Sequence, residues 1–528
     1  MDSQAWVADL VLEGGGVKGI GLVGAVSALP KTASLSTACR YRLCHSGGVE
    51  TATQTLHRLT SMQPYDDPAR WWDPPVEDPR VLRDLEVNDV DRLPWFYKRY
   101  PQPLPRVALP HELPATTAAA VDVLAGTANV ARADLSLPHL SRLLHLSAGV
   151  VRTTQRPYGT YLFRAAGSAG GRFPLEVYVA VPEGTQVPAG VHWYHPQDHA
   201  LVRVGPPPRK GSPVVVVTGV PWRTGWRYRE RGYRHVYWDA GTMLSQLLAA
   251  ADSAGITARL HTRFPDQAVA ALVGADGAHE WPVAVLALGE GTPALTATGP
   301  VAAGAVDAAP VEFPLITSAQ RAGEHDTLGS AWDRGAPVDV PAPGGPPVEA
   351  VVLVRGSQRR MDPNRGLPKS LLSASLSASV RGVTVPHWVA VHNVDGQPPG
   401  LYRWPDLSAP VRAGTLREEL YHLCCDQGLG CDAAFVVIAT ADLSTVDDRQ
   451  YREAQLAAGV VEGRLHLLAY ALGASASGMT FVDSLLPSFL GQPLDGLLFT
   501  CVGVPEYASA AGGTPGAPTP VRQVTPRL

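Results

Sequence analysis

Residues 175–181 read LEVYVAV and residues 387–391 read HWVAV, and both are short apolar runs of the kind that predicts a buried strand. Each run opens the same series of patterns along the chain. The series consists of a second apolar strand, a helix that opens at an Ala-Gly pair and a closing apolar strand: 214–218, 241–255 and 283–289 after the first run, and 433–441, 459–473 and 497–503 after the second. The order of the elements is therefore the same twice.

The spacing between the two series is nearly constant, which indicates an internal repeat. The helix-opening glycines, Gly241 and Gly459, are 218 residues apart, and the closing glycines, Gly289 and Gly503, are 214 residues apart. Apolar strands combined with long amphipathic helices predict an α+β fold rather than a regular alternation of strands and helices. Two tandem copies of one fold predict that the chain forms an intrachain pseudo-dimer.

Composition separates the repeat from its surroundings. The stretch between the copies is rich in Ala, Pro and Gly, and so is the stretch that follows the second copy. We therefore expect five segments: an N-terminal region at 1–104, a first domain at 105–292, a linker at 293–348, a second domain at 349–506 and a disordered tail at 507–528.

The charge balance and the cysteine count exclude several classes of protein. The 528 residues include 44 Lys and Arg against 48 Asp and Glu, which predicts neither a nucleic-acid partner nor an anionic membrane partner. No run of about 18 uncharged apolar residues occurs, so we expect a soluble, cytoplasmic protein. Six cysteines are too few for a disulfide framework, and the spacing of Cys424, Cys425 and Cys431 is not that of zinc ligands. We therefore expect no metal.

Two segments carry residues suited to a nucleotide ligand. Arg355, Ser357 and Arg359 combine two guanidinium groups with a hydroxyl, a set of donors that suits a phosphate. In the first copy, the small residues 168–170 (Ser-Ala-Gly) precede the strand at 175–181 and would allow backbone amides to approach a flat ring. A solvated basic surface and an ordinary glycine-rich turn are the alternative interpretations of these two segments.

Several motifs, occurring together and in order, resemble the SagB-type peptide dehydrogenases, which are FMN-dependent nitroreductase-like proteins. These motifs are Ser-Ala-Gly before Pro-Leu-Glu-Val-Tyr, the stretch from Arg227-Tyr228 to Gly232-Tyr233-Arg234, the Ala-Gly helix, and the stretch from Val394-Asp395-Gly396 to Pro399-Gly400-Leu401-Tyr402. The resemblance implies a nitroreductase fold, FMN as cofactor, and oxidation of an azoline heterocycle in a ribosomally made peptide, with oxygen as electron acceptor. It also implies a peptide substrate and a cyclodehydratase of the same pathway as partner.

The resemblance also implies where the flavin binds. In that family the flavin lies at a dimer interface, between an Arg-Ser-Arg segment of one subunit and a Ser-Gly segment of the other. Here each copy keeps one half of this set, and Gly478-Met479 matches the segment placed against the flavin ring: Arg355, Ser357, Arg359, Gly478 and Met479 in the second copy, and Ser168, Ala169 and Gly170 in the first. We therefore expect one flavin per chain, in a pseudo-dimeric monomer or a higher homo-oligomer.

The catalytic residues implied by the resemblance are altered in this chain. Azoline-oxidising members carry a Lys-Tyr pair, and Arg227 and Tyr228 stand at these positions. An arginine stays protonated far above neutral pH, so Arg227 could orient or stabilise charge, and Tyr228 is left to relay a proton. Two alternatives stay open: an NAD(P)H-dependent nitro or quinone reductase that acts on a small molecule, and a flavin-binding or peptide-binding scaffold without catalysis.

Two further patterns are expected to have no catalytic role. Residues 10–21 (LVLEGGGVKGIG) resemble the oxyanion loop of patatin-like lipid acyl hydrolases, but Cys44 replaces the first glycine of the nucleophile motif around Ser46, and Asp276 falls inside the first domain. We therefore expect a fragment without hydrolase activity. The closely spaced histidines at 192, 195 and 199 are expected on a solvent-exposed loop.

Overall fold

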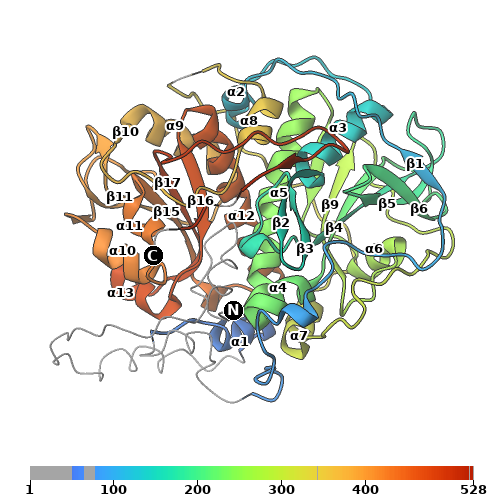
Figure 1. Cartoon of the computed structure of the whole chain (residues 1–528), viewed down its shortest axis with the longest axis horizontal. Coiled ribbons are helices and arrows are strands. Elements are labelled where there is room, and N and C mark those ends of the chain that lie inside the picture. Colours follow the sequence, from blue (N-terminus) through green and yellow to red (C-terminus); the bar gives the residue numbers. More distant parts are fainter. Residues whose placement is uncertain (1–49, 65–77, 342, 523, 527–528) are drawn as a thin grey trace.

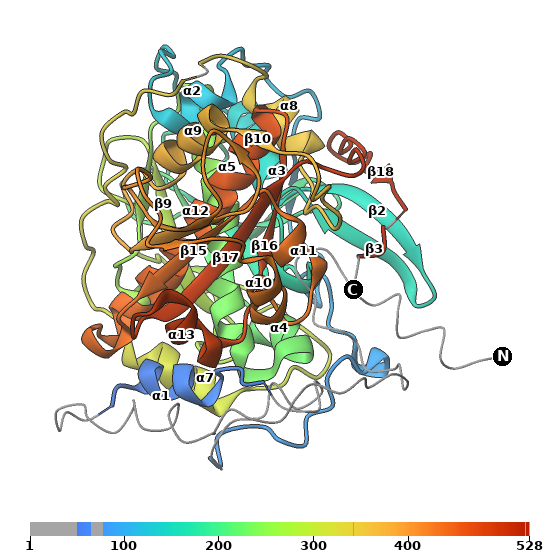
Figure 2. The ribbon, with the colours of Figure 1, turned by 90° about the vertical axis from the view of Figure 1, so that its left-hand side faces the viewer.

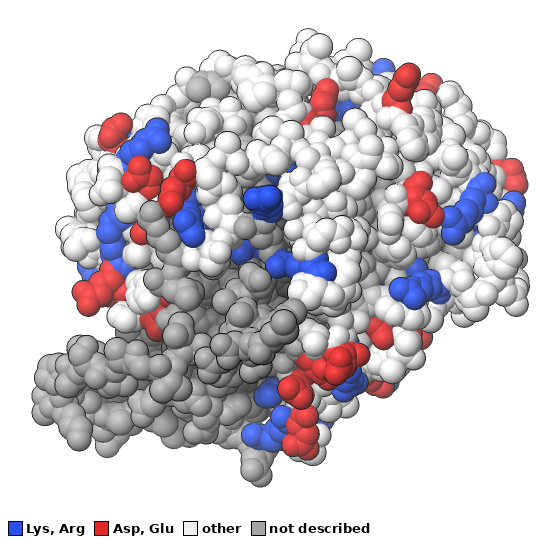
Figure 3. Space-filling model, viewed as in Figure 1, with Lys and Arg blue, Asp and Glu red and all other residues white. Residues whose placement is uncertain are grey.

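The computed structural model of the chain describes residues 50–64, 78–341, 343–522 and 524–526. The glycine-rich stretch at 10–21 and Ser46 lie outside the described residues. No helix among the described residues combines the length and the apolar character needed to cross a membrane. On the face shown in Figure 3, acidic and basic side chains are interspersed rather than gathered by sign.

The first half of the chain forms a seven-stranded antiparallel sheet. In sheet order its strands are β1 (Arg106–Ala108), β6 (Ala200–Gly205), β5 (Gly190–His195), β4 (Leu175–Val181), β7 (Val214–Gly219), β9 (Trp281–Leu288) and β8 (Ala258–His261). Strands β4, β7 and β9 occupy the centre and every residue in them is buried, as their largely apolar sequences predict.

The second half forms a six-stranded antiparallel sheet with the same plan. In sheet order its strands are β14 (Arg412–Ala413), β13 (Gly400–Arg403), β11 (His387–Val391), β15 (Phe435–Ala441), β17 (Asp495–Gly503) and β16 (Ser475–Met479). These strands correspond one to one, in sequence order and in sheet order, to β6, β5, β4, β7, β9 and β8. The expected α+β repeat is therefore confirmed, and the halves pack as an intrachain pseudo-dimer (Figure 1).

The two long helices lie side by side between the sheets (Figure 1). They are α5 (Gly232–Ser253) and α12 (Asp448–Ala471). The expectation that each helix opens at its Ala-Gly pair is wrong, because Gly241 and Gly459 lie in the helix interiors. A Cβ on Gly241 would come 2.4 Å from the carbonyl oxygen of Leu456, and one on Gly459 would come 2.3 Å from that of Trp238. The glycines therefore allow the two backbones to touch where the helices cross.

The remaining helices pack around the two long helices and the sheets (Figure 2). They are α1 (Ala52–Leu59), α2 (Ala120–Ala125), α3 (Leu137–Ala148), α4 (Pro221–Tyr228), α6 (Asp266–Val273), α7 (Pro314–Ala322), α8 (Val348–Val354), α9 (Lys369–Ser379), α10 (Arg417–Leu423), α11 (Gly428–Asp432) and α13 (Leu486–Leu490). A two-stranded pair is formed by β10 (Leu367–Pro368) and β12 (Val394–Asp395).

Buried ion pairs also join the halves, near the N-terminal ends of α5 and α12. Asp483, from the second half, accepts hydrogen bonds from Arg231 at 2.5 Å and from Arg234 at 2.6 Å, both from the first half. Asp266, from the first half, pairs with Arg449 and Arg452 of α12 at 2.7 and 3.2 Å. Because one carboxylate serves two guanidinium groups in each cluster, the relative position of the halves is specified by charge as well as by packing.

The segments expected to lack structure are partly regular. Helix α7 lies within the expected linker and buries Leu315, Ile316 and Ala319. In the expected tail, β18 (Thr519–Pro520) adds a strand beside β2 (Val150–Arg156), which pairs with β3 (Gly159–Arg164) (Figure 2). The expectation of disorder is therefore wrong for the described tail residues, because their backbone groups find partners on β2. The other segment boundaries stay predictions.

The histidine group at 192–199 is not exposed. His192 and His199 are 1% exposed and His195 is 8% exposed, on and beside strand β5. His199 is bonded on both ring nitrogens, at 2.7 Å to the Ser141 hydroxyl and at 2.9 Å to the Tyr194 hydroxyl. The polar residues among these histidines predicted a loop, and this prediction is wrong. Hydrogen-bond partners such as those of His199 allow an imidazole to be buried.

Candidate functional site

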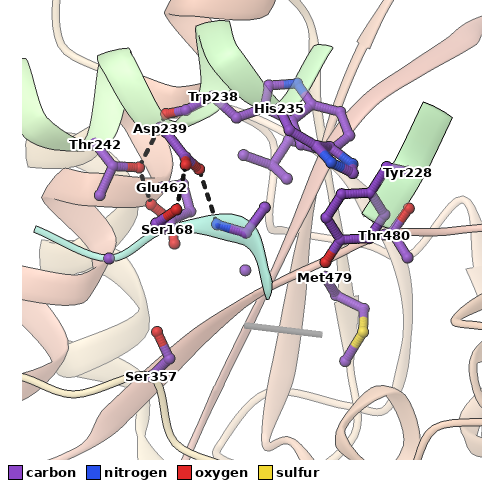
Figure 4. A pocket seen from close by; sticks show the side chains of 14 residues that line it. Ser168, Tyr228, His235, Trp238, Asp239, Thr242, Ser357, Glu462, Met479 and Thr480 are labelled. Atoms are coloured by element: carbon purple, nitrogen blue, oxygen red, sulfur yellow. Dashed lines mark hydrogen bonds between the residues drawn. The ribbon is translucent and has the colours of Figure 1, made fainter. Parts of the chain in front are cut away.

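A cavity of about 50 Å³ lies between the two halves (Figure 4). The first half contributes the turn before β4, the end of α4 and one face of α5, and the second half contributes the Ser357 loop, α12, β16 and β17. The lining residues are Gly167, Ser168, Ala169, Tyr228, His235, Trp238, Asp239, Thr242, Ser357, Glu462, Gly478, Met479, Thr480 and Leu498. Within the described ranges, no group of three or more His, Cys, Asp or Glu side chains is arranged to hold a metal ion.

Arg355 reaches from the second half to the turn of the first half. Its Nη2 donates to the carbonyl oxygen of Ala165 at 2.9 Å. A Cβ on Gly167 would lie 3.2 Å from Nη1 of Arg355 and 3.6 Å from the hydroxyl of Ser357, so the glycine keeps this contact open. Arg355 is only 2% exposed, and among the described residues its Nε and Nη1 have no hydrogen-bond partner. Buried, unpartnered guanidinium N–H groups are suited to an anion.

Arg359 does not line the cavity and is bonded to the tail. Its Nη1 donates to the carbonyl oxygen of Val524 at 3.0 Å, and its backbone N–H donates to the hydroxyl of Tyr507 at 3.2 Å. The tail therefore engages the second arginine of the Arg-Ser-Arg segment, while the first arginine and the serine face the other half.

The Ser168 turn is held by Asp239 of α5. The hydroxyl of Ser168 donates to Oδ2 of Asp239 at 2.5 Å, and the N–H of Ala169 donates to Oδ1 at 2.9 Å. Gly170 has a φ of +60° and a Cβ there would come 2.5 Å from the Tyr228 hydroxyl, so this turn requires glycine for both conformation and space. The turn thus presents small residues to the cavity, with two of its donors engaged by a carboxyl group.

Two carboxyl groups border the cavity. Burial raises the pKa of Asp239 well above its ordinary value, and the nearby charge of Glu462 acts in the same direction. Glu462 accepts a hydrogen bond from the hydroxyl of Thr242, and its Oε1 lies 3.3 Å from Nδ1 of His466. A Cβ on Gly478 would come 2.9 Å from Oε1 of Glu462, so the absence of a side chain at Gly478 leaves room for this carboxyl group.

Tyr228 lines the cavity, whereas Arg227 does not. Burial raises the pKa of Tyr228, and the charge of Arg227 acts against this rise. The Arg227 guanidinium lies 5.7 Å from the centre of the Tyr228 ring and donates through Nη1 to Oδ1 of Asn88 at 3.2 Å. Tyr228 is therefore protonated at neutral pH. Arg227 contacts Tyr228 but does not itself line the cavity.

Comparison with known proteins identifies the fold. No protein-family model matches the sequence. A protein of Methanocaldococcus jannaschii described as a nitroreductase is 31% identical over 137 residues; the match covers 23% of this chain and 66% of the length of that protein. A crystal structure from Anabaena variabilis, also described as a nitroreductase, matches with a TM-score of 0.66 at 23% identity, over 87% of this chain and 100% of that chain. The fold is that of a nitroreductase. Because the structural match spans most of this chain, it includes both halves.

Within this nitroreductase fold, the structure brings most of the predicted residues to one place. Ser168, Ala169, Tyr228, Ser357, Gly478 and Met479 line the cavity. Arg355 and Gly170 touch residues that line it, and Arg227 and Arg359 lie outside it.

Four cavity residues of α5 were not among those predicted from the sequence. They are His235, Trp238, Asp239 and Thr242. A signal was available, because His235, Asp239 and Thr242 recur at intervals of four and three residues in a helix that is otherwise rich in apolar residues, and this spacing places them on one face.

Proposed function

We propose that the chain is an FMN-dependent oxidoreductase that binds one flavin between its two halves. The observation that carries the proposal is the position of Arg355: its Nη1, which has no hydrogen-bond partner among the described residues, lies with the Ser357 hydroxyl against the first-half turn at Gly167. Arg355 and Ser357 would hold the phosphate. The turn at 168–170 and the Gly478-Met479 segment would flank the ring, and bound FMN would supply hydride acceptance.

The donor set suits FMN, but the space has to enlarge. A cavity of about 50 Å³ is far smaller than the pockets of roughly 300–1,000 Å³ that hold small ligands. FMN binding therefore requires the walls to part. Met479 has three rotatable side-chain bonds, and the two bonds of the Ser168 turn to Asp239 link that turn to α5, so we expect Met479 and this link to change when FMN binds.

One flavin per chain is expected because the reciprocal site lacks both of its halves. In the second half, helix α9 and residues 380–386 precede β11, and no Ser-Gly turn like the one before β4 occurs there. In the first half, residues 111–131 contain no arginine to match Arg355.

We further propose that the substrate is an azoline heterocycle in a ribosomally made peptide, oxidised with oxygen as the final acceptor and supplied by a cyclodehydratase. This rests on the resemblance to the SagB-type dehydrogenases in the motifs around residues 168–178 and 227–241. A non-catalytic flavin-binding or peptide-binding scaffold is a second candidate, favoured by the small cavity and by the position of Arg227 outside it. The third candidate, a reductase of small molecules, differs from the dehydrogenase in its electron donor, which is NAD(P)H instead of the peptide.

Titration with FMN, followed by flavin fluorescence quenching, tests the proposal. We expect one FMN per chain and a flavin absorbance band in the purified protein. Arg355→Gln removes the charged donors and is expected to weaken binding about 100-fold, since charge-assisted hydrogen bonds contribute about 1.5–3 kcal/mol each. Arg360→Gln is the matched control, because the Arg360 side chain donates to the carbonyl oxygen of Thr525 and pairs with Glu506, and it does not line the cavity. Two FMN per chain, or equal affinities in the two variants, would contradict the proposed site.

The reaction direction is tested anaerobically on the flavin-loaded protein. Bleaching of the flavin by a thiazoline dipeptide supports the dehydrogenase, prompt bleaching by NAD(P)H supports the reductase, and bleaching by neither supports the scaffold.

A further inference from the structure

A second cavity, of about 660 Å³, lies on the first half and shares no lining residue with the first cavity. Its walls are the segment at 96–99, the hairpin of β2 and β3, the turn at 197–198 between β5 and β6, and residues 516 and 518 of the tail. Figure 2 shows this hairpin standing out from the body of the chain, with β18 of the tail beside β2. Pockets that hold small ligands measure roughly 300–1,000 Å³, so this cavity has room for a ligand as it stands.

The lining offers apolar surface together with uncharged hydrogen-bonding groups. Phe96 and Leu162 are among its apolar residues, and Thr153 adds a hydroxyl from the hairpin. The Tyr97 hydroxyl donates to Oε1 of Gln197 at 2.7 Å, and the side-chain N–H groups of Gln197 make no hydrogen bond to a described residue. An extended peptide presents the complementary set, because its side chains need apolar contacts and its backbone carbonyls need donors.

Arg99 lies on the cavity side of its segment. Lys98, the residue before it, points into the first half, where its Nζ lies 2.6 Å from Oε2 of buried Glu280. Successive side chains of an extended segment point to opposite sides, so Tyr97 and Arg99 both point away from that interior. Both residues line the cavity, and Arg99 is exposed. Its backbone is fixed by two hydrogen bonds with Ala305, at 2.9 and 2.8 Å.

The guanidinium of Arg99 is held in place and has unengaged donors. It stacks on the ring of Trp95, with Cζ 3.9 Å from the ring centre, and makes no hydrogen bond to a residue in the described part of the chain. Asp198, the acidic residue of the lining, is already paired with Arg106 at 2.7 Å. A planar guanidinium whose N–H groups are open suits a carboxylate, which it binds through two parallel hydrogen bonds. The charge of the cavity therefore favours an acidic ligand.

The hairpin also links the second cavity to the first. After Leu162, the chain continues from β3 to Gly167 and Ser168, which line the first cavity. Five residues of extended chain span at most about 18 Å, so Leu162 and Gly167 lie no farther apart than that. Tyr161, next to Leu162, donates its hydroxyl to the carbonyl oxygen of Gly171 at 2.5 Å and ties the hairpin to the same turn. A short peptide is therefore long enough to reach both cavities.

We propose that the second cavity binds the stretch of the substrate peptide that flanks the heterocycle, and that Arg99 pairs with an acidic side chain of this stretch. This binding mode rests on the proposed function, because it requires the heterocycle to lie in the first cavity. Apolar side chains of the stretch pack against Phe96 and Leu162, and its backbone accepts hydrogen bonds from Gln197. The second cavity thereby selects peptides with an acidic residue a few positions from the heterocycle.

Two pairs of capped peptides, otherwise apolar and uncharged, test this pairing. Each peptide carries one thiazoline and, about four positions from it, either Glu or Gln, a separation that fits within the roughly 18 Å above. The first pair has the variable residue on the N-terminal side of the thiazoline, and the second pair has it on the C-terminal side. Affinities are measured by isothermal titration calorimetry on the full chain, with and without FMN.

In one of the two pairs, we expect the wild-type chain to bind the Glu peptide about fivefold more tightly than the Gln peptide, the upper end of what a solvent-accessible ion pair contributes. Arg99→Gln should bring this ratio to about one, because it removes the charge but keeps an amide donor. Arg132→Gln is the matched control, since Arg132 is an exposed arginine of the first half that lines neither cavity, and it should keep the ratio. Equal affinities in both pairs, or an unchanged ratio in Arg99→Gln, would overturn the proposal.

Hydrogen exchange locates the bound peptide without any variant. The Glu peptide should slow the exchange of backbone amides in the β2–β3 hairpin and at 96–99, and unchanged exchange there would refute the site. Competition by N-acetylglutamate at concentrations as low as those of the peptide would also refute it, because the cavity would then be a site for a small carboxylate.

Anaerobic bleaching of the flavin by the same peptides separates this site from the proposed function. If the wild-type chain prefers the Glu peptide but binds no FMN or is not bleached, azoline oxidation fails, while peptide binding in the second cavity is upheld. If the peptides bleach the flavin but Glu and Gln peptides bind equally, the dehydrogenase is upheld and the second site fails.

Discussion

Gly459→Ala tests the helix crossing through which the two halves pack against each other. The added Cβ would stand 2.3 Å from the carbonyl oxygen of Trp238 and 2.8 Å from its Cα, so it overlaps backbone atoms that cannot rotate away. Parting two packed helices to admit a methyl group costs about 1–3 kcal/mol or more. In a helix without this contact, replacing glycine by alanine stabilises by about 1 kcal/mol. The sign of the change in unfolding free energy therefore reports whether the helices touch.

Urea unfolding followed by far-UV circular dichroism measures this change. We expect a lower midpoint for Gly459→Ala and for Gly241→Ala, and a double variant whose loss is smaller than the sum, because one separation of the helices accommodates both methyl groups. Ser377→Ala, at a half-buried position of α9, is the control and should change the unfolding free energy by no more than about 0.5 kcal/mol. A raised midpoint for either glycine variant would refute the crossing.

Two further predictions concern the buried ion pair and the phenol. Burial acts to raise the pKa of Asp483, but the charges of Arg231 and Arg234 outweigh burial and hold this pKa below its ordinary value. The ion pairs of Asp483 therefore stabilise the fold at pH values above the unfolded pKa of about 3.9. This stabilisation is lost as the pH falls below that value. Asp483→Asn should lower the unfolding free energy at pH 7 by about 3–5 kcal/mol and flatten its fall between pH 5 and 3; equal urea midpoints at pH 7 would contradict the pairing. Tyr228→Phe should slow flavin bleaching by the thiazoline dipeptide more than it weakens dipeptide binding, and an unchanged rate in stopped-flow measurements would remove Tyr228 from the mechanism.

The nitroreductase neighbour supports the fold of this chain, whereas the proposed cofactor site rests on the chain's own cavity and the proposed reaction rests on the sequence resemblance. At 23% identity, the match to the Anabaena variabilis structure extends across both halves but does not transfer an activity. The argument for FMN comes instead from the buried guanidinium N–H groups of Arg355 that have no partner among the described residues.

The sequence by itself determined the strands and the repeat. The runs at 175–181 and 387–391 coincide with β4 and β11 residue for residue, and the spacing of the two series predicted two copies of one fold. Such predictions succeed because the apolar character of a strand can be read from its own residues. A strand that is apolar on both faces must be buried on both faces, whatever its place in the fold.

Only the tertiary structure decided which side chains meet between the halves. Gly241 and Gly459 look like helix openings in the sequence, and their positions in mid-helix make sense only once each is seen against the backbone of the other helix. The same holds for His235 and Asp239, because a residue on α5 becomes part of a site only when α12 and the Ser168 turn close over it. Contacts between residues this far apart in the chain depend on how whole elements pack, and no local pattern encodes that.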